Sequence, residues 1–226
     1  MIQPTLQKTP DTSCPSNLRI SQPPRGYRFT SDSVALARFI RISPSESLLD
    51  LCTGVGIIPL LVWERNPFWY AVGIELQKEL AELAAKNVRQ NHLTEKILIV
   101  QEDLRVFRFD SLDLPQRFPT VDRFDVISAN PPYRAAGSGR MSPNSQRALA
   151  RHEIQLTFPQ LIKACQQFLK PDGRFCFVHL AARETQVLGN LKDHGFTIRR
   201  KEYSRTKGHK ALLLIEAGYD PSSHQS

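Results

Sequence analysis

The chain has 226 residues, of which 41% are hydrophobic and 23% charged, a composition typical of one soluble globular domain. No apolar run is long enough to cross a bilayer or to form a secretion signal, which favours a cytoplasmic protein, and the four cysteines lack the spacing of a zinc site. Lys and Arg outnumber Asp and Glu by 30 to 22, and the net charge of +8 indicates either an anionic partner, with nucleic acid the leading candidate, or a solvated basic surface.

Strand-like and helix-like segments alternate between two polar ends. Residues 1–17 and 219–226 are expected to be tails, which leaves a single domain over 18–218. Short apolar runs that alternate with amphipathic helices predict βαβ units, and therefore an α/β fold whose mostly parallel sheet has helices on both faces. Two final runs without a helix between them predict an antiparallel pair at one sheet edge. The expected strands are 47–52, 69–75, 96–103, 123–130, 173–180, 196–203 and 210–218, and the expected helices follow Gly56 and cover 76–91, 158–169 and 183–194.

Acidic residues and glycines follow the ends of the first strands, where an open parallel sheet binds its ligand. Asp50 ends the first strand, and Gly54 and Gly56 in the next turn let the backbone pass close to a ligand. Glu75 ends the second strand, where its carboxylate can accept hydrogen bonds from both hydroxyls of a ribose. This pattern predicts a cofactor that contains a nucleoside.

The details favour S-adenosylmethionine over a dinucleotide. A dinucleotide fingerprint needs a third glycine where this chain has Pro59, and the turn lacks the Gly-Lys-Ser/Thr ending of a P-loop. Asp50 would repel pyrophosphate but suits a ligand with an ammonium and a sulfonium. Asp103 can accept from an adenine amino group while Leu104 donates its backbone N–H to the ring. The alternatives are another nucleotide or a purely structural turn. The candidate cofactor-binding residues are Asp50, Cys52, Thr53, Gly54, Gly56, Glu75, Leu76, Asp103, Leu104 and Asn130.

The motif Asn-Pro-Pro-Tyr ends the fourth strand and supplies the candidate catalytic residues. The exocyclic amine of adenine is a poor nucleophile because its lone pair is conjugated into the ring. If the Asn130 side-chain oxygen and the Pro131 carbonyl each accept one N–H, the nitrogen can pyramidalise toward a donor methyl group. Pro131 and Pro132 restrict the backbone, and Tyr133 can stack on an unstacked base. The alternative is an ordinary Asn-Pro turn.

The motifs "DLCTGVGIIPLL", "GIE", "QED" and "NPPY" together resemble class I S-adenosylmethionine-dependent methyltransferases that act on amino groups. Residues 20–39 and 130–153 further resemble the bacterial family that methylates N6 of adenine in the anticodon loop of valine tRNA, and the resemblance covers about 18–215. It implies a Rossmann-like fold with seven strands, tRNA as the partner and N6-methylation of adenine as the reaction, without a metal.

The resemblance also extends the predicted site. It implies that residues 26–32 and the helix after them close over the methionine end of the cofactor, with Arg28 and Asp32 nearby. From the residues alone, Asp32 is only an acid at a helix start. The chain departs from the wider methyltransferase pattern at Cys52, where glycine is usual, which leaves the loop geometry there in question.

Basic residues gather in the long loop 134–147, in the segment after it and in the last hairpin, and such clusters can contact phosphates. Each residue alone is more often simply solvated. The candidate RNA-binding residues are Arg134, Arg140, Arg147, Arg151, Arg199, Arg200, Lys201 and Lys207.

Three other activities and one noncatalytic function compete with this interpretation. Protein-glutamine methyltransferases resemble the chain at Asn-Pro-Pro-Tyr, but they usually carry a helical domain ahead of the cofactor motif, for which fewer than 50 residues are present. A DNA adenine methyltransferase needs a recognition domain that the chain has little room for. Methylation of guanine N2 in ribosomal RNA stays open. A noncatalytic RNA-binding module is a further alternative, against which Asn130 and Tyr133 argue.

Overall fold

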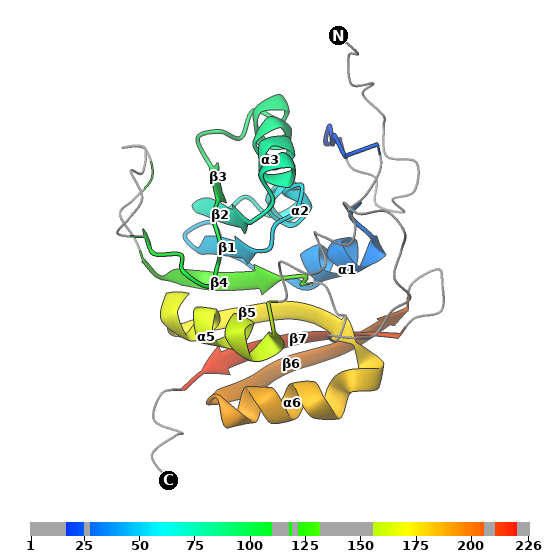
Figure 1. The fold of residues 1–226 in the computed structure, drawn as a ribbon, viewed down its shortest axis with the longest axis vertical. Coiled ribbons are helices and arrows are strands. Elements are labelled where there is room, and N and C mark those ends of the chain that lie inside the picture. Colours follow the sequence, from blue (N-terminus) through cyan, green and yellow to red (C-terminus); the bar gives the residue numbers. More distant parts are fainter. Residues whose placement is uncertain are drawn as a thin grey trace.

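The computed structural model describes residues 17–24, 28–109, 118, 122–131, 156–205 and 211–220. They form one central sheet with helices on both faces (Figure 1). The strands are β1 (Ser47–Leu51), β2 (Tyr70–Glu75), β3 (Ile97–Gln101), β4 (Phe124–Ala129), β5 (Leu169–Leu180), β6 (Phe196–Arg205) and β7 (Ala211–Tyr219). The α-helices are α1 (Ser31–Phe39), α2 (Ile57–Arg65), α3 (Lys78–Gln90), α5 (Phe158–Phe168) and α6 (Glu184–Asp193), with a short 3-10 turn, η2 (Ala181–Arg183), before α6.

The seven strands follow the order β3-β2-β1-β4-β5-β7-β6. The first five strands in this order pair in parallel, whereas β7 is antiparallel to both β5 and β6. The predicted fold class is therefore confirmed, including the antiparallel hairpin at one edge. Because β7 is inserted between β5 and β6, the edge strand is β6.

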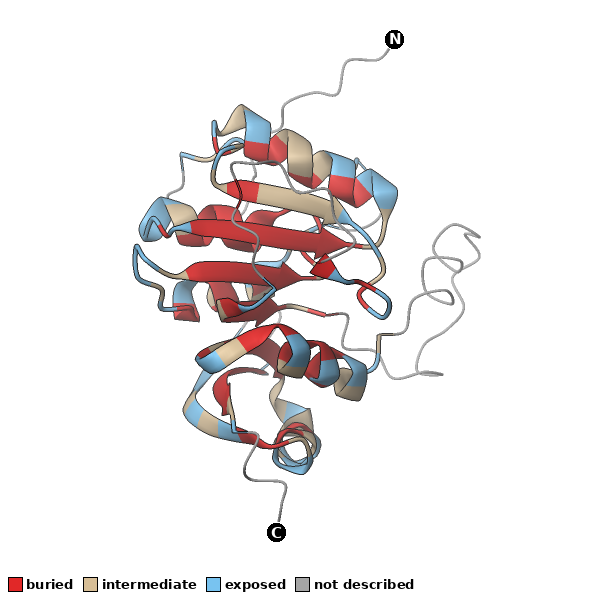
Figure 2. Cartoon of the chain, turned by 90° about the vertical axis from the view of Figure 1, so that its left-hand side faces the viewer, coloured by how far each residue is buried: buried red, intermediate tan, exposed pale blue. Residues whose placement is uncertain are grey.

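The central strands are covered on both faces. Every residue of β1 and β2 is buried (Figure 2), which explains why their sequences are continuous apolar runs without alternation. One hydrophobic cluster joins α1, α2 and α3 to one face of the sheet, and a second joins α5 and α6 to the other. Because β1 to β5 are parallel, their carboxyl ends all lie at the same end of the sheet, which is where a ligand site is expected.

Helix spacing and capping follow from the local sequence. In α3 the buried residues are Leu80, Ala81, Ala84, Asn87 and Val88, a spacing that keeps one face of a helix against the sheet. At the start of α5 the Thr157 hydroxyl accepts from the backbone N–H of Gln160, and the Gln160 side chain accepts in return from the Thr157 N–H. Both helices are thus specified by their own residues.

The segment after β3 adds aromatic side chains to the core. Phe107 and Phe109 pack edge to face with ring centroids 4.7 Å apart, and both contact the Phe168 ring of α5. The Phe109 ring also lies 5.3 Å from that of Phe124. The sequence patterns did not predict this contribution, because the alternation at Phe107 and Phe109 is too short to indicate a strand.

Several element boundaries differ from the predictions. The third strand ends at Gln101 rather than at Asp103, because the Asp103 carbonyl accepts from the N–H groups of Val106 and Phe107, at 3.0 and 2.9 Å, in a turn. β5 begins at Leu169, which pairs with Phe124, and β7 extends to Tyr219. Asn17, in the predicted tail, donates its N–H to Glu64 at 2.7 Å. The remainder of both predicted tails lies outside the described residues.

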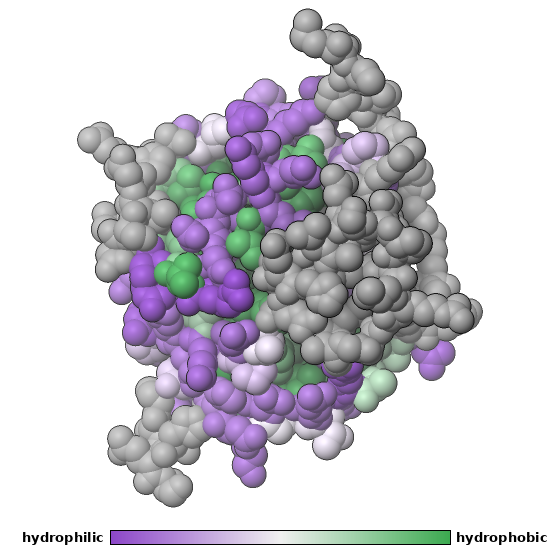
Figure 3. All heavy atoms as spheres, in the orientation of Figure 1, coloured by the Kyte–Doolittle hydropathy of each residue, from purple (hydrophilic) through white to green (hydrophobic). Residues whose placement is uncertain are grey.

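The surface seen in Figure 3 is dominated by hydrophilic side chains, with hydrophobic residues in small separate patches. The exposed large hydrophobic residues of the described chain are Trp69, Val106 and Tyr203. Among the described residues, no helix combines the length and hydropathy needed to cross a membrane.

Candidate active site

A cavity of about 330 Å³ lies beyond the carboxyl ends of β1, β2 and β4 and beside the turn after β3. This volume falls within the usual range for a small-molecule site. Ten of the residues predicted from the sequence line it: Arg28, Asp32, Cys52, Gly54, Glu75, Leu76, Asp103, Leu104, Asn130 and Pro131. The structure adds residues that no pattern had singled out, namely Thr30, Ile74, Gln77, Leu80, Glu102, Arg105 and Leu156.

Asp50 lies behind this cavity and holds the first loop. Its carboxylate is fully buried and accepts hydrogen bonds from the Thr53 and Ser128 hydroxyls, each at 2.6 Å. Burial raises the pKa of Asp50 to about 7, although both hydroxyls oppose the shift, and the nearby Glu75 carboxylate raises it further. The group therefore titrates near neutrality, and a cation in the adjoining cavity would favour its ionised form.

Glu75 connects the second strand to the glycine loop. One oxygen of its buried carboxylate accepts from the Gly54 N–H at 2.8 Å, and the other accepts from the Gln77 N–H at 3.0 Å. Burial raises the pKa of Glu75, while the backbone donors lower it in part. The same side chain that was predicted to bind a ribose thus also fixes the loop that a ligand would approach.

The loop after β1 contains three residues with left-handed backbone conformations. Gly54 has φ +60° and Gly56 has φ +76°, and a Cβ at Gly56 would also lie 3.3 Å from the Ala84 Cβ. Cys52 has φ +59°, a conformation that is costly for a residue with a side chain. Cys52 therefore adopts a backbone conformation typical of glycine, the residue that is usual at this position in the methyltransferases that the chain resembles. Burial, with three nearby carboxylates, raises the pKa of the Cys52 thiol, which stays neutral.

Asn130 is positioned by helix α1, which lies 97 positions earlier in the sequence. Its Nδ2 donates to the Ser33 hydroxyl of α1 at 2.8 Å, and Ser33 is itself buried. In this orientation the amide nitrogen faces Ser33, and Oδ1 is the acceptor atom of the side chain. Pro131 is buried and lines the cavity. Pro132 and Tyr133 lie outside the described residues.

Asp103 forms an ion pair with Arg105 in the turn after β3. Arg105 donates from Nε to both carboxylate oxygens at 3.0 Å, and this partner lowers the pKa of Asp103. If Asp103 also accepts a hydrogen bond from an adenine amino group, as predicted, its carboxylate would bind both that group and Arg105. Leu104 is buried and lines the cavity, as an adenine site requires.

The structure separates the basic residues predicted to bind RNA. Arg199 donates to the Asp172 carbonyl at 2.9 Å, Lys201 pairs with Glu184 at 2.7 Å, and Arg200 pairs with Glu216 at 2.9 Å. The three consecutive side chains therefore reach three different places. The other predicted RNA-binding residues, Arg134, Arg140, Arg147, Arg151 and Lys207, lie outside the described residues.

Within the described residues, no three His, Cys, Asp or Glu side chains are grouped as metal ligands. The cavity instead combines carboxylates, a glycine loop and an orienting amide. This set of groups can bind a cationic nucleoside ligand and hold an N–H substrate beside it.

Comparison with known proteins agrees with this chemistry. A family model described as RNA methyltransferase matches residues 31–192. The tRNA1(Val) (adenine(37)-N6)-methyltransferase of Porphyromonas gingivalis is 32% identical over 211 residues, which cover 90% of this chain and 78% of that protein. The enzyme of the same name from Aliivibrio salmonicida is 27% identical over 202 residues, 88% of this chain and 81% of that protein.

A solved structure supports the fold. TrmN from Thermus thermophilus superposes with a TM-score of 0.57 at 22% identity, over 82% of this chain and 48% of that one.

Proposed function

This chain belongs to the RNA methyltransferase family, and from that premise we propose that it transfers a methyl group from S-adenosylmethionine to N6 of an adenine in tRNA. The proposed target is the anticodon-loop adenine of valine tRNA, adenine 37 in the names of its relatives. The observation that carries the proposal is that Asn130 and Pro131 line the same cavity as Glu75 and Asp103. The amide motif and the acidic cofactor residues thus meet in one place.

The charges of the cavity fit the proposed cofactor. Four carboxylates, of Asp32, Glu75, Glu102 and Asp103, line it together with two guanidiniums, of Arg28 and Arg105. The excess of negative charge suits a ligand that carries a sulfonium and an ammonium. Bound S-adenosylmethionine would supply an electrophilic methyl group. Glu75 would bind its ribose, Asp103 and Leu104 its adenine, and Arg28 and Asp32 its methionine end.

Asn130 and Pro131 would orient the nucleophile. With Nδ2 bonded to Ser33, the Asn130 oxygen would serve as one acceptor, and the Pro131 carbonyl would serve as a second on a restrained backbone. If each accepts one N–H of the adenine amine, the nitrogen lone pair turns out of the ring. The amine would release one proton to solvent when it accepts the methyl group. Alignment and electrostatics supply the acceleration, so a strong base is not required.

The proposal is tested with the purified protein, methyl-labelled S-adenosylmethionine and tRNA from cells that lack the modification. After digestion to nucleosides, label is expected in N6-methyladenosine, and Asn130→Ala serves as the control that keeps the cofactor cavity. Label in another nucleoside would keep the cofactor assignment and overturn the target. Absence of label in tRNA, with label in ribosomal RNA or protein when these are supplied instead, would overturn the tRNA assignment.

A further inference from the structure

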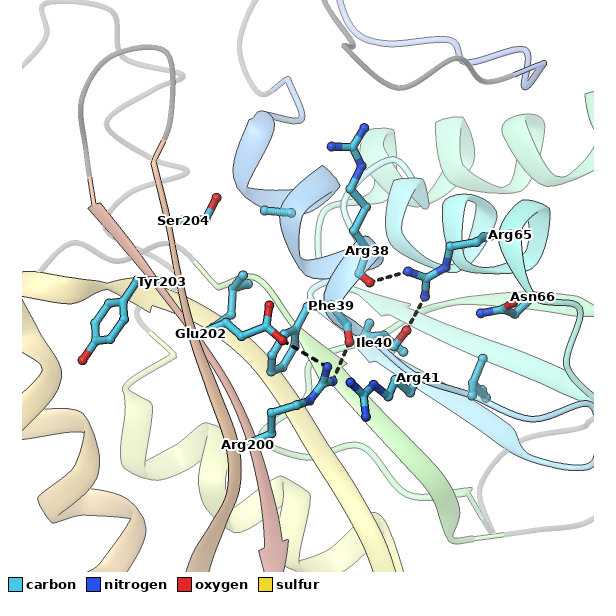
Figure 4. Close-up of a pocket in the computed structure, with 13 residues that line it drawn as sticks. Arg38, Phe39, Ile40, Arg41, Arg65, Asn66, Arg200, Glu202, Tyr203 and Ser204 are labelled. Atoms are coloured by element: carbon cyan, nitrogen blue, oxygen red, sulfur yellow. Dashed lines mark hydrogen bonds and ion pairs between the residues drawn. The ribbon is translucent and has the colours of Figure 1, made fainter.

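A second cavity, of about 650 Å³, lies at the opposite end of α1 from the cofactor cavity. The carboxyl-terminal ends of α1 and α2 line it together with β6 and one residue of β7 (Figure 4). Four arginines meet here from three separate segments: Arg38 and Arg41 at and after the end of α1, Arg65 at the end of α2, and Arg200 on β6. None of the first three was singled out in the sequence.

Two of these arginines bind the end of α1. Arg65 donates to the carbonyls of Arg38 and Ile40, and Arg200 donates to the Phe39 carbonyl at 2.6 Å and lies over the Phe39 ring at 3.8 Å. Cations at a helix carboxyl end satisfy its last carbonyls and interact well with its dipole. Arg65 and Arg200 therefore have a structural function that accounts for their positions.

Arg38 and Arg41 differ from that pair. Both are exposed, and the Arg38 side chain extends away from the Arg65 guanidinium that binds its carbonyl. Glu216 pairs with Arg200 at 2.9 Å, and Glu202 lies 3.3 Å from the same guanidinium. Four arginines and one acid, Glu202, are among the residues that line the cavity, and Glu202 contacts Arg200. The charged side chains of the lining are therefore mainly cationic, which suits an anionic ligand.

Successive side chains of β6 point to opposite faces of the sheet. Arg200, Glu202 and Ser204 line the cavity, and Tyr203 also borders it. Lys201 instead faces Glu184 of α6 at 2.7 Å, and the Tyr203 hydroxyl bonds the same carboxylate. The cavity thus lies on the α1–α2 side of the sheet, whereas α5 and α6 cover the other side.

We propose that this arginine cavity binds phosphate groups of the tRNA backbone through Arg38 and Arg41 while the target adenine enters the cofactor cavity. The inference rests on the proposed function and deepens it, because it names the surface that holds the substrate. Helix α1 joins the two sites, since Thr30 and Asp32 at its start line the cofactor cavity and Phe39 at its end lines the arginine cavity. Nine residues at a rise of 1.5 Å separate the ends of the helix by about 13 Å, which a few nucleotides of RNA can span.

The test is the salt dependence of tRNA binding, because each phosphate contact releases bound counterions. We would measure the dissociation constant for unmodified valine tRNA over a series of salt concentrations for the wild type and for Arg38→Gln/Arg41→Gln. The matched control is Lys163→Gln/Lys192→Gln, which removes two exposed charges from α5 and α6 on the other side of the sheet. A third variant, Arg38→Lys/Arg41→Lys, keeps the charges.

In the arginine-to-glutamine variant, the slope of log K against log salt should fall in magnitude by about 2, and affinity should fall about tenfold or more at moderate salt. The lysine-to-glutamine control should change little, and the charge-keeping variant should retain most of the slope. S-adenosylmethionine affinity should be unchanged throughout, which shows that the variants are folded. If the double variant does not fold, Arg41→Gln alone should lower the slope by about 1.

Equal slopes for the wild type, the arginine variant and the control would overturn the arginine cavity as the RNA site and leave the methyltransferase proposal intact. A wild-type protein that binds cofactor but neither binds nor methylates tRNA would instead overturn the proposed substrate, and this inference with it.

Discussion

The hydrogen bond from Asn130 Nδ2 to the Ser33 hydroxyl, 2.8 Å long, joins the carboxyl end of β4 to α1 across 97 positions of sequence. The amide nitrogen faces Ser33, and the contact couples the proposed catalytic motif to a helix that also borders the cofactor cavity. Two predictions follow from this one contact.

Asn130→Ala should leave cofactor affinity nearly unchanged and lower methyl transfer on the order of 10²-fold or more, because it removes an acceptor that aligns the reacting nitrogen. Binding of S-adenosylmethionine by calorimetry and single-turnover methylation of tRNA would separate the two effects. Near-normal turnover in this variant would contradict the proposed mechanism.

Ser33→Ala should have a smaller effect of the same kind. The amide would keep its oxygen but lose the partner that orients it, and we expect turnover to fall by about tenfold, which corresponds to about 1.4 kcal/mol. Ser45→Ala, an exposed serine outside the helix, is the matched control. Equal turnover in the two variants would show that Ser33 does not position Asn130.

Asp50 should make stability depend on pH. Its pKa in the folded protein is raised to about 7 from 3.8, so between these values the folded state binds more protons than the unfolded state, and stability falls as pH rises. The free energy of unfolding of the wild type should therefore decrease between pH 5 and pH 8, relative to Asp50→Asn, by a few kcal/mol. Urea denaturation without cofactor would measure this difference, and parallel pH profiles would contradict it.

Cys52 should tolerate glycine better than a branched side chain. At φ +59° a β-branched residue is strained, so Cys52→Val should lower the free energy of unfolding by about 1–2 kcal/mol. Cys52→Gly should stay within about 0.5 kcal/mol of the wild type, because the relief of strain offsets the greater entropy of the unfolded chain. Chemical denaturation of both variants without cofactor is the measurement. A valine variant as stable as the glycine variant would show that this loop relaxes.

Asn87 should link the first described segment to the glycine loop. This buried side chain donates to the carbonyls of Ser21 and Val55, at 3.0 and 2.9 Å, and accepts from the Ser21 N–H at 2.7 Å. Asn87→Ala should cost about 2–3 kcal/mol of stability and weaken cofactor binding, because it leaves buried backbone groups without partners. Asn190→Ala, which loses one bond to the Gln186 carbonyl within α6, should cost much less. Equal costs in denaturation would contradict the link.

The fold and much of the cofactor site could be predicted from local patterns. Among the described residues, alternating apolar runs and amphipathic helices predicted every strand and every α-helix except α1, which only the resemblance anticipated. Asp50, Gly54 and Glu75 were found because strand ends are visible in the sequence and parallel strands end at one edge. The end of the third strand was misplaced by two residues because the charged run after Val100 has no period that marks a boundary.

By itself, the sequence determined the type and order of the elements and the chemical groups at the strand ends, since these depend on residues that are near neighbours in the chain. Only the tertiary structure decided that Ser33 orients Asn130, and that Arg199, Arg200 and Lys201 reach three different partners. It alone also brought Arg38, Arg41, Arg65 and Arg200 into one cavity. The physical reason is that contacts between distant residues depend on how helices pack on the sheet, and that adjacent residues of a strand face opposite sides.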